Sequence, residues 1–411
     1  MRVTILLRCL GMMHGGGETR HLAWARELRR AGDHVTIITG RPLFAQARYM
    51  LDPSIVVLRS PYVRDLVYRF QRTRGFGRLL ARMLRADEEW FCRAAWRRIA
   101  QAPQRPDIVH AHALSAAARV RTLPIPTVIN LPGMADPRDI PDIRLADAIV
   151  ADGFAAEHLP AALGRPVEHV PKGVDVSVFR PDGPNRRAAL GLEGQRVALV
   201  VSRLVPIKNV ALAVDAMSIA APTRPNLRLL IVGDGPLRAA LESRVATLGL
   251  SEQVIFAGRV EHSAMPEWYR SVDLFVLPSE FDNSPNVVLE AMASGLPVVA
   301  TDVGGLRQYM QHGVNGDLVP AGDGRALAEA IARYADDEEL SARIGRRNRD
   351  DVVAGFSWAQ SARVLRSVYD RVIARGKNAR GELVEPRARP SASAEATADK
   401  STGSGRAVNA R

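Results

Sequence analysis

Residues 273–305, DLFVLPSEFDNSPNVVLEAMASGLPVVATDVGG, are the stretch of this chain that decides its fold. Apolar runs near its two ends predict strands, the first over 274–277, and the spacing of apolar residues between them predicts a helix over about 286–294. Pro285 stands just ahead of this helix, where its missing N–H costs little, and Gly295 ends it. Strand, helix and strand in this order are the repeating unit of an α/β fold.

The polar groups of the same stretch suit a nucleotide-sugar. Asp282 lies in the loop before the helix, and Glu290 follows eight positions later, about one turn into the helix. Carboxylates accept hydrogen bonds from sugar and ribose hydroxyls, and the free amides of Asn286 and Val287 at the helix start favour an anion such as phosphate. An ordinary strand–loop–helix with surface acids is the alternative interpretation.

The stretch resembles the signature of glycosyltransferase family 4, whose members are retaining enzymes with the GT-B fold. The family has Glu, seven residues, a second Glu and then A-M-A-x-G-x-P-V, and here Glu290 is followed by AMASGLPVV. The first acid is Asp282 rather than Glu, which is a departure from the family. The resemblance implies that Glu290 binds the ribose hydroxyls and that Asp282 contacts the transferred sugar. It also implies the α/β fold class: two Rossmann-like βαβ domains that face each other across a cleft.

Two cations earlier in the second half of the chain are candidates for the donor diphosphate. Arg203 ends the predicted strand RVALVVSRL, and Lys208 precedes the next helix. An Arg fork and a Lys point charge across such a turn can converge on one anion, although solvated loop cations are the alternative. The family places its diphosphate-binding Arg and Lys at these positions. The resemblance also places Val260, at the end of strand VIFAGRV, where relatives hold the base by backbone contacts.

The first half of the chain begins with a strand and a glycine turn. Three glycines at 15–17 follow the strand, and they allow the backbone to approach a ligand closely. The family has a matching loop that meets the donor diphosphate, so the resemblance makes Gly16 and Gly17 candidates for this contact. Tightening of a strand–helix corner is the alternative.

His110 and His112 end a second strand of the first half, IVHAH. Strand ends of an open parallel sheet face the ligand crevice, so His112 is a candidate for contact with donor sugar, acceptor or phosphate. It is also the one visible candidate for a general base, whereas a packed or capping histidine is the alternative. Many relatives carry a His near Asn130 that contacts the reacting sugar, and this chain departs from them there.

The length of 411 residues suggests two domains. We predict a Rossmann-like acceptor-side domain over 1–168, a nucleotide-sugar-binding domain over 169–355, a C-terminal helix over 356–376 that crosses back to the first domain, and a tail over 377–411. The tail is rich in Ala, Ser, Gly, Arg and Pro and has almost no large apolar residues, so we expect it to be disordered.

The net charge of +12 is concentrated in one stretch: residues 59–98 hold eleven arginines against four acids. Aromatic residues are interleaved with these arginines, which is a basic amphipathic pattern. Either it is a solvated helix face over the core of the first domain, or residues 60–100 dock on an anionic membrane surface. An RNA-binding motif does not accompany the charge, so we expect no nucleic acid partner.

Other features limit the class of protein. No run of eighteen apolar residues occurs, the two cysteines have neither metal nor disulfide spacing, and the chain begins with a strand rather than a signal peptide. We therefore expect a cytoplasmic protein, either free or peripheral on the inner face of the plasma membrane. No D-x-D triplet occurs, so we expect neither a metal nor another cofactor.

These observations together predict a metal-independent, retaining hexosyltransferase of cell-envelope polysaccharide biosynthesis. Its donor would be a nucleotide-sugar, with UDP-sugars first and GDP-mannose second, and its acceptor a glycan or a lipid-linked glycan. Arg203 and Lys208 would stabilise the leaving diphosphate. A sugar-nucleotide epimerase of the same fold and a non-enzymatic basic protein that binds nucleotide or RNA are the alternatives.

Overall fold

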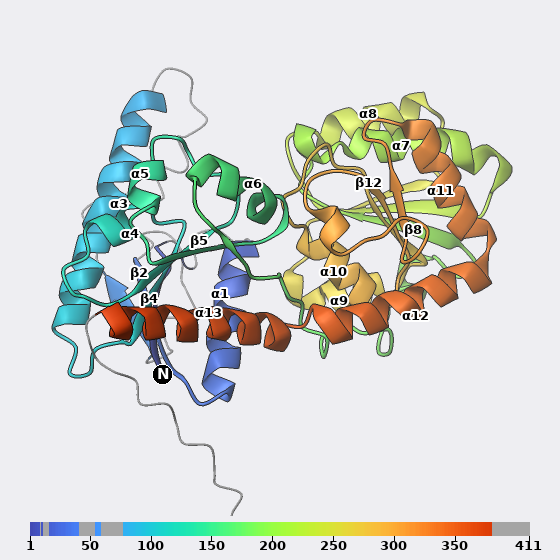
Figure 1. Ribbon diagram of the computed structural model, residues 1–411. Coiled ribbons are helices and arrows are strands. Elements are labelled where there is room, and N and C mark those ends of the chain that lie inside the picture. Colours follow the sequence, from blue (N-terminus) through green and yellow to red (C-terminus); the bar gives the residue numbers. More distant parts are fainter. Residues whose placement is uncertain (9, 11–15, 41–53, 59–76, 380–411) are drawn as a thin grey trace, which may run out of the picture.

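The computed structural model describes residues 1–8, 10, 16–40, 54–58 and 77–379. They form two lobes, each built on a parallel sheet (Figure 1). The first lobe has seven strands in the order β3-β2-β1-β4-β5-β6-β7, and the second has six in the order β10-β9-β8-β11-β12-β13. The predicted α/β class with two Rossmann-like sheets is confirmed.

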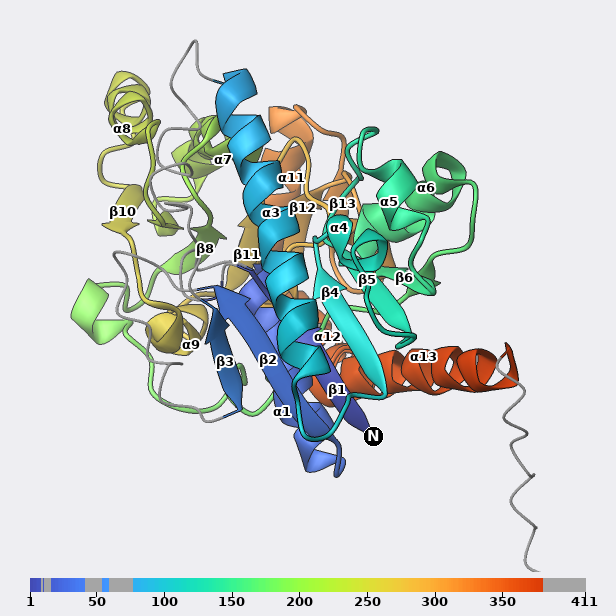
Figure 2. The same ribbon diagram turned by 90° about the vertical axis from the view of Figure 1, so that its left-hand side faces the viewer.

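Successive strand residues of the first lobe are buried on opposite faces of the sheet, which explains its layers. Its strands are β1 (Arg2–Leu6), β2 (His34–Gly40), β3 (Ile55–Leu58), β4 (Ile108–His112), β5 (Thr127–Leu131), β6 (Ala148–Ala151) and β7 (Glu168–His169). Its helices are α1 (Gly16–Arg30), α3 (Gly77–Ala100), α4 (Ala116–Arg119), α5 (Ile140–Ile143) and α6 (Gly153–Leu163), joined by the last helix, α13 (Trp358–Ala379). Ile108 packs toward α1 and α13, and its neighbour Val109 packs toward α3, which crosses the sheet in Figure 2. The helices therefore cover both faces of the sheet, as in other parallel α/β folds.

The second lobe repeats this arrangement. Its strands are β8 (Arg196–Val201), β9 (Leu227–Val232), β10 (Val254–Gly258), β11 (Leu274–Leu277), β12 (Val298–Thr301) and β13 (Asp317–Val319). Its helices are α7 (Val210–Ala220), α8 (Arg238–Thr247), α9 (Met265–Tyr269), α10 (Asn286–Ala293), α11 (Gly324–Asp336) and α12 (Glu338–Gly355). Val200 packs toward α7, α8 and α11, whereas Leu199 packs toward α9, α10 and α12.

The chain crosses between the lobes twice, and the two crossings are hydrogen-bonded to each other. The Val174 amide donates to the Phe356 carbonyl at 2.9 Å, and the Trp358 amide donates to the Val174 carbonyl at 3.3 Å. After the second crossing, α13 packs on α1 of the first lobe, where the Trp24 indole donates to the Ser361 hydroxyl at 2.7 Å. Strand β7 lies across the expected boundary at 168, and the chain beyond 379, which includes most of the expected tail, lies outside the described residues.

Helix α3 carries the described part of the basic stretch. Phe91 and Trp96 are fully buried in the core under this helix, so these aromatic residues pack against the sheet and are not available for a membrane. Arg82, Arg97 and Arg98 are exposed on its outer face. Residues 59–76 of the same stretch lie outside the described part of the chain. No helix within that part is both long enough and apolar enough to cross a membrane.

Candidate functional site

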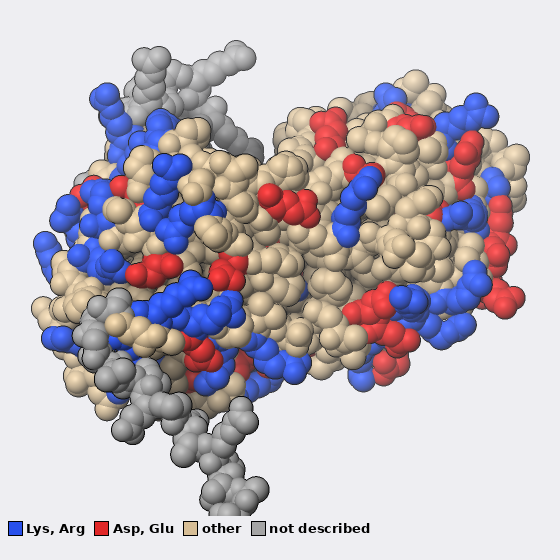
Figure 3. Space-filling view, viewed as in Figure 1, with Lys and Arg blue, Asp and Glu red and all other residues tan. Residues whose placement is uncertain are grey.

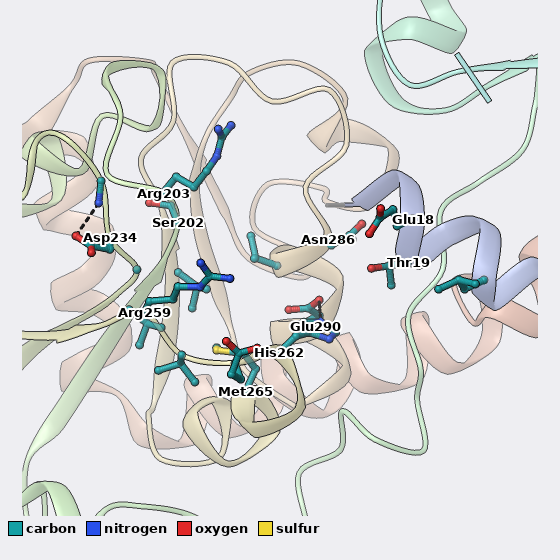
Figure 4. A pocket seen from close by; sticks show the side chains of 18 residues that line it. Glu18, Thr19, Ser202, Arg203, Asp234, Arg259, His262, Met265, Asn286 and Glu290 are labelled. Atoms are coloured by element: carbon teal, nitrogen blue, oxygen red, sulfur yellow. Dashed lines mark hydrogen bonds and ion pairs between the residues drawn. The ribbon is translucent and has the colours of Figure 1, made fainter. Parts of the chain in front are cut away.

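A cavity of about 960 Å³ lies between the two lobes. Helix α1 forms its wall on the first lobe through Glu18, Thr19 and Leu22. The opposite wall comes from the second lobe, at the carboxyl ends of its strands and the start of α10, through Ser202, Arg203, Gly233, Asp234, Gly235, Arg259, Val260, Glu261, His262, Asn286, Val287 and Glu290 (Figure 4). Parallel α/β sheets bind ligands at this edge.

Glu290 is held at both of its carboxylate oxygens in the cavity wall. It is 6 % exposed; the Tyr269 hydroxyl donates to its Oε2 at 3.0 Å, and His262 Nε2 lies 3.0 Å from its Oε1. Burial raises the pKa of Tyr269, so this hydroxyl remains a donor, and the hydrogen bond with Glu290 raises the pKa of His262. The carboxylate is therefore held in one orientation before a ligand arrives.

The start of α10 lies beside this carboxylate. Pro285 occupies the N-cap position and provides no side-chain capping bond to the first turn. The Asn286 side chain lines the cavity, and its Oδ1 is buried without a hydrogen-bond partner in the described chain. A helix end of this kind attracts an anion because its amides and its dipole both present positive charge.

Two arginines reach the cavity from the strand ends opposite α10. Arg259 extends its side chain toward the middle of the cavity and toward Glu290, whereas Arg203 runs toward the upper edge of the view (Figure 4). Neither guanidinium is paired with a residue in the described ranges. Arg259 was not predicted from the sequence, although its place directly after a strand was a usable signal.

The turn after β9 was also missed as part of the site. Gly233 has a φ of +139°, and a Cβ there would overlap the Ser202 carbonyl oxygen. A Cβ at Gly235 would lie 2.5 Å from the Leu204 carbonyl oxygen. Glycine therefore lets the turns after β8 and β9 lie against each other at the cavity wall.

Lys208 and Asp282 form an ion pair with each other and do not line the cavity. Both side chains are mostly buried, with 18 % and 16 % of their surface exposed. From the sequence we expected Lys208 to contact the diphosphate and Asp282 to contact the sugar. In the structure each neutralises the other.

The glycine turn and His112 meet at the start of α1. Gly16 and Gly17 are the first residues of this helix rather than loop residues, and a Cβ at Gly17 would lie 2.5 Å from His112 Nε2. His112 Nδ1 lies 2.9 Å from the Asn130 side-chain oxygen, on the paired strand β5. Since this oxygen is an acceptor, Nδ1 carries the proton and Nε2 keeps its lone pair. Burial lowers the pKa of His112 to about 4, so the ring is neutral at pH 7 and suits accepting a hydrogen bond better than acid–base catalysis.

A series of hydrogen bonds links buried, neutral side chains in the same corner of the first lobe. His21 Nδ1 lies 2.7 Å from the Gly17 carbonyl oxygen, and its Nε2 lies 3.2 Å from His110 Nε2. The Tyr369 hydroxyl of α13 lies 2.7 Å from His110 Nδ1. Because a carbonyl only accepts, His21 donates to Gly17, His110 donates to His21, and Tyr369 donates to His110. Burial lowers the pKa of His21 and His110, which keeps both rings neutral.

Comparison with known proteins assigns the family. Residues 14–178 match the sequence model described as Glycosyltransferase Family 4, and residues 183–351 match that of Glycosyl transferases group 1. The lipopolysaccharide core biosynthesis mannosyltransferase LpsB of Rhizobium meliloti is 33 % identical over 56 % of this chain and 67 % of its own length. The GDP-mannose-dependent alpha-mannosyltransferase of Mycobacterium tuberculosis is 32 % identical over 65 % of this chain and 73 % of its own. The chain belongs to glycosyltransferase family 4.

Solved structures show the fold of this family 4 glycosyltransferase. Sucrose-phosphate synthase from Thermosynechococcus elongatus superposes with a TM-score of 0.74 at 21 % identity, covering 91 % of this chain and all of that one. HepE from Anabaena, solved in complex with UDP, has a TM-score of 0.70 at 20 % identity, covering 90 % of this chain and all of its own. The predicted GT-B fold and the predicted class of enzyme, a glycosyltransferase, are confirmed.

The structure brings the candidate residues of this family 4 glycosyltransferase together in three groups. Arg203, Val260, Asn286, Val287 and Glu290 line the cavity. His112 packs on Gly17 at the start of α1, and Lys208 pairs with Asp282. Within the described ranges no three His, Cys, Asp or Glu side chains are grouped so that they hold a metal ion. The roles of these residues and the metal-independent reaction stay predictions.

Proposed function

We propose that this protein is a retaining glycosyltransferase that moves a sugar from a nucleotide-sugar to a glycan or lipid-linked acceptor in cell-envelope polysaccharide biosynthesis. The observation that carries the proposal is the fixed carboxylate of Glu290 in a cavity that two arginines and the start of a helix also line. The similarity to a lipopolysaccharide core mannosyltransferase supports the pathway, and the UDP complex of HepE supports the class of donor.

The donor nucleotide makes three kinds of contact with the second-lobe wall of the cavity. Glu290 accepts hydrogen bonds from the ribose hydroxyls, and the backbone at Val260 holds the base. The diphosphate lies between the guanidinium groups of Arg203 and Arg259 and the first amides of α10. Arginine forks and a helix start are both strong partners for phosphate oxygens, so the leaving group needs no metal ion in this proposal.

Transfer then depends on the groups beside the sugar. His112, neutral and fixed by Asn130, accepts a hydrogen bond from a sugar hydroxyl, and the Gly16–Gly17 start of α1 faces the diphosphate. When the donor separates the ion pair between Lys208 and Asp282, Asp282 contacts the sugar and Lys208 contacts the leaving phosphate. The bond from C1 to the phosphate oxygen breaks, the acceptor oxygen bonds to C1 on the same face, and its proton passes to the departing phosphate.

A donor panel tests this function. Thermal unfolding is measured with UDP, GDP and ADP at equal concentrations. We expect one nucleotide to raise the Tm most, UDP being the first expectation and GDP the second. The Glu290→Ala variant is expected to show no rise in Tm. The corresponding nucleotide-sugars are then incubated with acceptors, and the anomeric configuration of the product is read by NMR. No nucleotide response would overturn the proposal. Donor conversion without any acceptor would indicate an epimerase, and salt-dependent RNA binding without a nucleotide response would indicate a nucleic-acid-binding protein.

The proposed acceptor side includes an anionic membrane surface. The exposed arginines of α3 lie on the first lobe, where Figure 3 shows many Lys and Arg side chains on the visible face. Because the aromatic residues under α3 are buried, we propose electrostatic adsorption through residues 60–100 rather than insertion. Sedimentation with anionic vesicles is expected to capture the protein at low salt and release it at high salt. Equal binding to neutral vesicles, or none that depends on salt, would contradict it.

A further inference from the structure

Helix α6 of the first lobe begins against the second lobe, and the second lobe provides its cap. The Gly153 amide donates to the Gln308 side-chain oxygen at 3.0 Å. The Phe154 amide donates to the Asn283 carbonyl at 3.1 Å, and the Ala155 amide donates to the Asn283 side-chain oxygen at 2.9 Å. The first amides of a helix have no partner within it, and a side chain of the same segment usually provides one. Here the partners come from the opposite lobe.

The residue that ordinarily caps α6 is engaged elsewhere. Asp152 occupies the N-cap position, and Asp is among the preferred residues there, yet its side chain makes no capping hydrogen bond. Its carboxylate, 1 % exposed, instead forms an ion pair at 2.5 Å with Arg20 of α1. The first amides of α6 therefore take their partners from the second lobe, and Asp152 does not cap them.

The contact between the lobes is built for close backbone approach. A Cβ at Gly153 would overlap the Asn283 carbonyl oxygen, and a Cβ at Gly305 would lie 2.5 Å from the Gly153 Cα. The second lobe also donates hydrogen bonds to the first lobe. The Asn283 side-chain amide donates to the Pro132 carbonyl at 3.0 Å, and the Gln308 side-chain amide donates to the Gly153 carbonyl at 3.0 Å. Figure 1 shows the corresponding place, where α6 faces the second lobe.

The same contact adjoins the proposed sugar-binding acid. Asn283 directly follows Asp282, and the Asp282 carbonyl accepts from the Gly305 amide at 3.2 Å. A buried Lys172 also donates to the Ser284 carbonyl from the first crossing between the lobes. The loop that carries Asp282 is thus held by one bond within the second lobe and by bonds to the first lobe and the first crossing.

We propose that Asn283 and Gln308 are positioning residues, which cap α6 from the opposite lobe and thereby hold the lobes closed with Asp282 placed for the sugar. When the lobes separate, the first amides of α6 lose these partners, so this cap is present only in the closed state. This inference rests on the proposed function for the role of Asp282, whereas the capping of α6 from the opposite lobe does not depend on that role.

Hydrogen exchange at residues 153–155, measured with and without UDP together with turnover, tests the proposal. In the wild type, exchange of these amides is expected to slow when UDP is bound. In Asn283→Ala it is expected to be about five-fold faster than in the wild type, the order expected for loss of one helix cap. Turnover should fall about ten-fold while the Kd for UDP changes less than two-fold, because Asn283 acts on the sugar side.

Two further variants separate positioning from general stability. Asn283→Asp keeps the acceptor for the Ala155 amide, so it is expected to restore slow exchange there. Asp337→Ala removes a cap within the second lobe, the 2.8 Å bond from the Leu340 amide, and should leave both turnover and α6 exchange unchanged. Equal α6 exchange in wild type and Asn283→Ala, or an equal loss of turnover in Asp337→Ala, would overturn the inference. If the protein still binds UDP when either of these results is found, the proposed function is not contradicted.

Discussion

The two lobes use their histidines in opposite ways. In the first lobe His21, His110 and His112 have pKa values below the ordinary value, and burial is the largest cause for each. In the second lobe the pKa of His262 is raised, because this ring is hydrogen-bonded to the Glu290 carboxylate. Burial without a counter-charge disfavours the imidazolium, whereas a neighbouring carboxylate stabilises it. The three first-lobe rings are therefore neutral, whereas the second-lobe ring at the cavity wall is paired with a charge.

This difference matches the two ends of the proposed donor. The diphosphate carries formal charge, and the cavity wall of the second lobe presents Arg203 and Arg259 to it. A sugar carries only hydroxyls, for which a neutral acceptor such as His112 Nε2 is sufficient. Removing a charge from the second lobe should therefore cost more activity than altering a dipole of the first lobe.

The largest effect is expected for Glu290→Ala, which removes the fixed carboxylate of the cavity. We expect turnover to fall at least about 100-fold, the order found when one preorganised polar contact is lost. Steady-state kinetics with the preferred donor measures it, and an unchanged circular dichroism spectrum shows that the fold is kept. Glu329→Ala, at a solvent-exposed acid of the same lobe, is the matched control and should be close to wild type. Near-wild-type activity of Glu290→Ala would remove this residue from the site.

Lys208→Ala tests whether the ion pair with Asp282 belongs to the site. We expect turnover to fall about 100-fold, because the leaving phosphate loses a cation and Asp282 is left without its partner. Single-turnover measurements place the loss in the chemical step rather than in donor binding. If Lys208→Ala keeps wild-type turnover, the pair is structural, and the charges of Arg203 and Arg259 are sufficient.

The buried histidines predict that acid destabilises the first lobe. Each stays neutral in the folded chain, whereas the unfolded chain takes up a proton near the ordinary pKa of 6.5, so their stability is fully present above pH 6.5 and is lost as pH falls toward 4. Each histidine contributes a slope of up to about 1.4 kcal/mol per pH unit in the free energy of unfolding. His262 has the opposite sign: its contribution is present below pH 6.5 and is lost as pH rises through its raised pKa.

Denaturant unfolding between pH 5 and pH 8 measures this slope. His112→Gln is expected to reduce it, since one titrating group is removed, and His34→Gln, at an exposed histidine of the same lobe, should leave it unchanged. Equal slopes for His112→Gln and wild type would show that the lowered pKa of His112 does not control acid stability.

Local sequence signals anticipated strands in both lobes and the helix start of the stretch at 273–305. The strand at Leu274–Leu277 and the start of the helix at Asn286 appear as predicted, because apolar spacing, Pro285 and Gly295 define them locally. The partners of Glu290 were not predictable in this way, since His262 and Tyr269 lie more than twenty residues upstream. The partners of the first-lobe residues depend on which strands pair and on where α13 packs, and no local pattern encodes either.

Asn130 shows what such a distant partner contributes, and Asn130→Asp is the mildest test of the comparison. The carboxylate still accepts from His112 Nδ1–H, but its charge is expected to raise the pKa of His112 from about 4 toward neutrality. A protonated His112 has no lone pair on Nε2, so turnover of the variant should fall as pH decreases through the new pKa, by several-fold at pH 6. The wild type should show no such loss between pH 8 and pH 6. Superimposable pH profiles would mean that His112 does not accept a hydrogen bond from the substrate, and the first lobe would then contribute shape rather than a dipole.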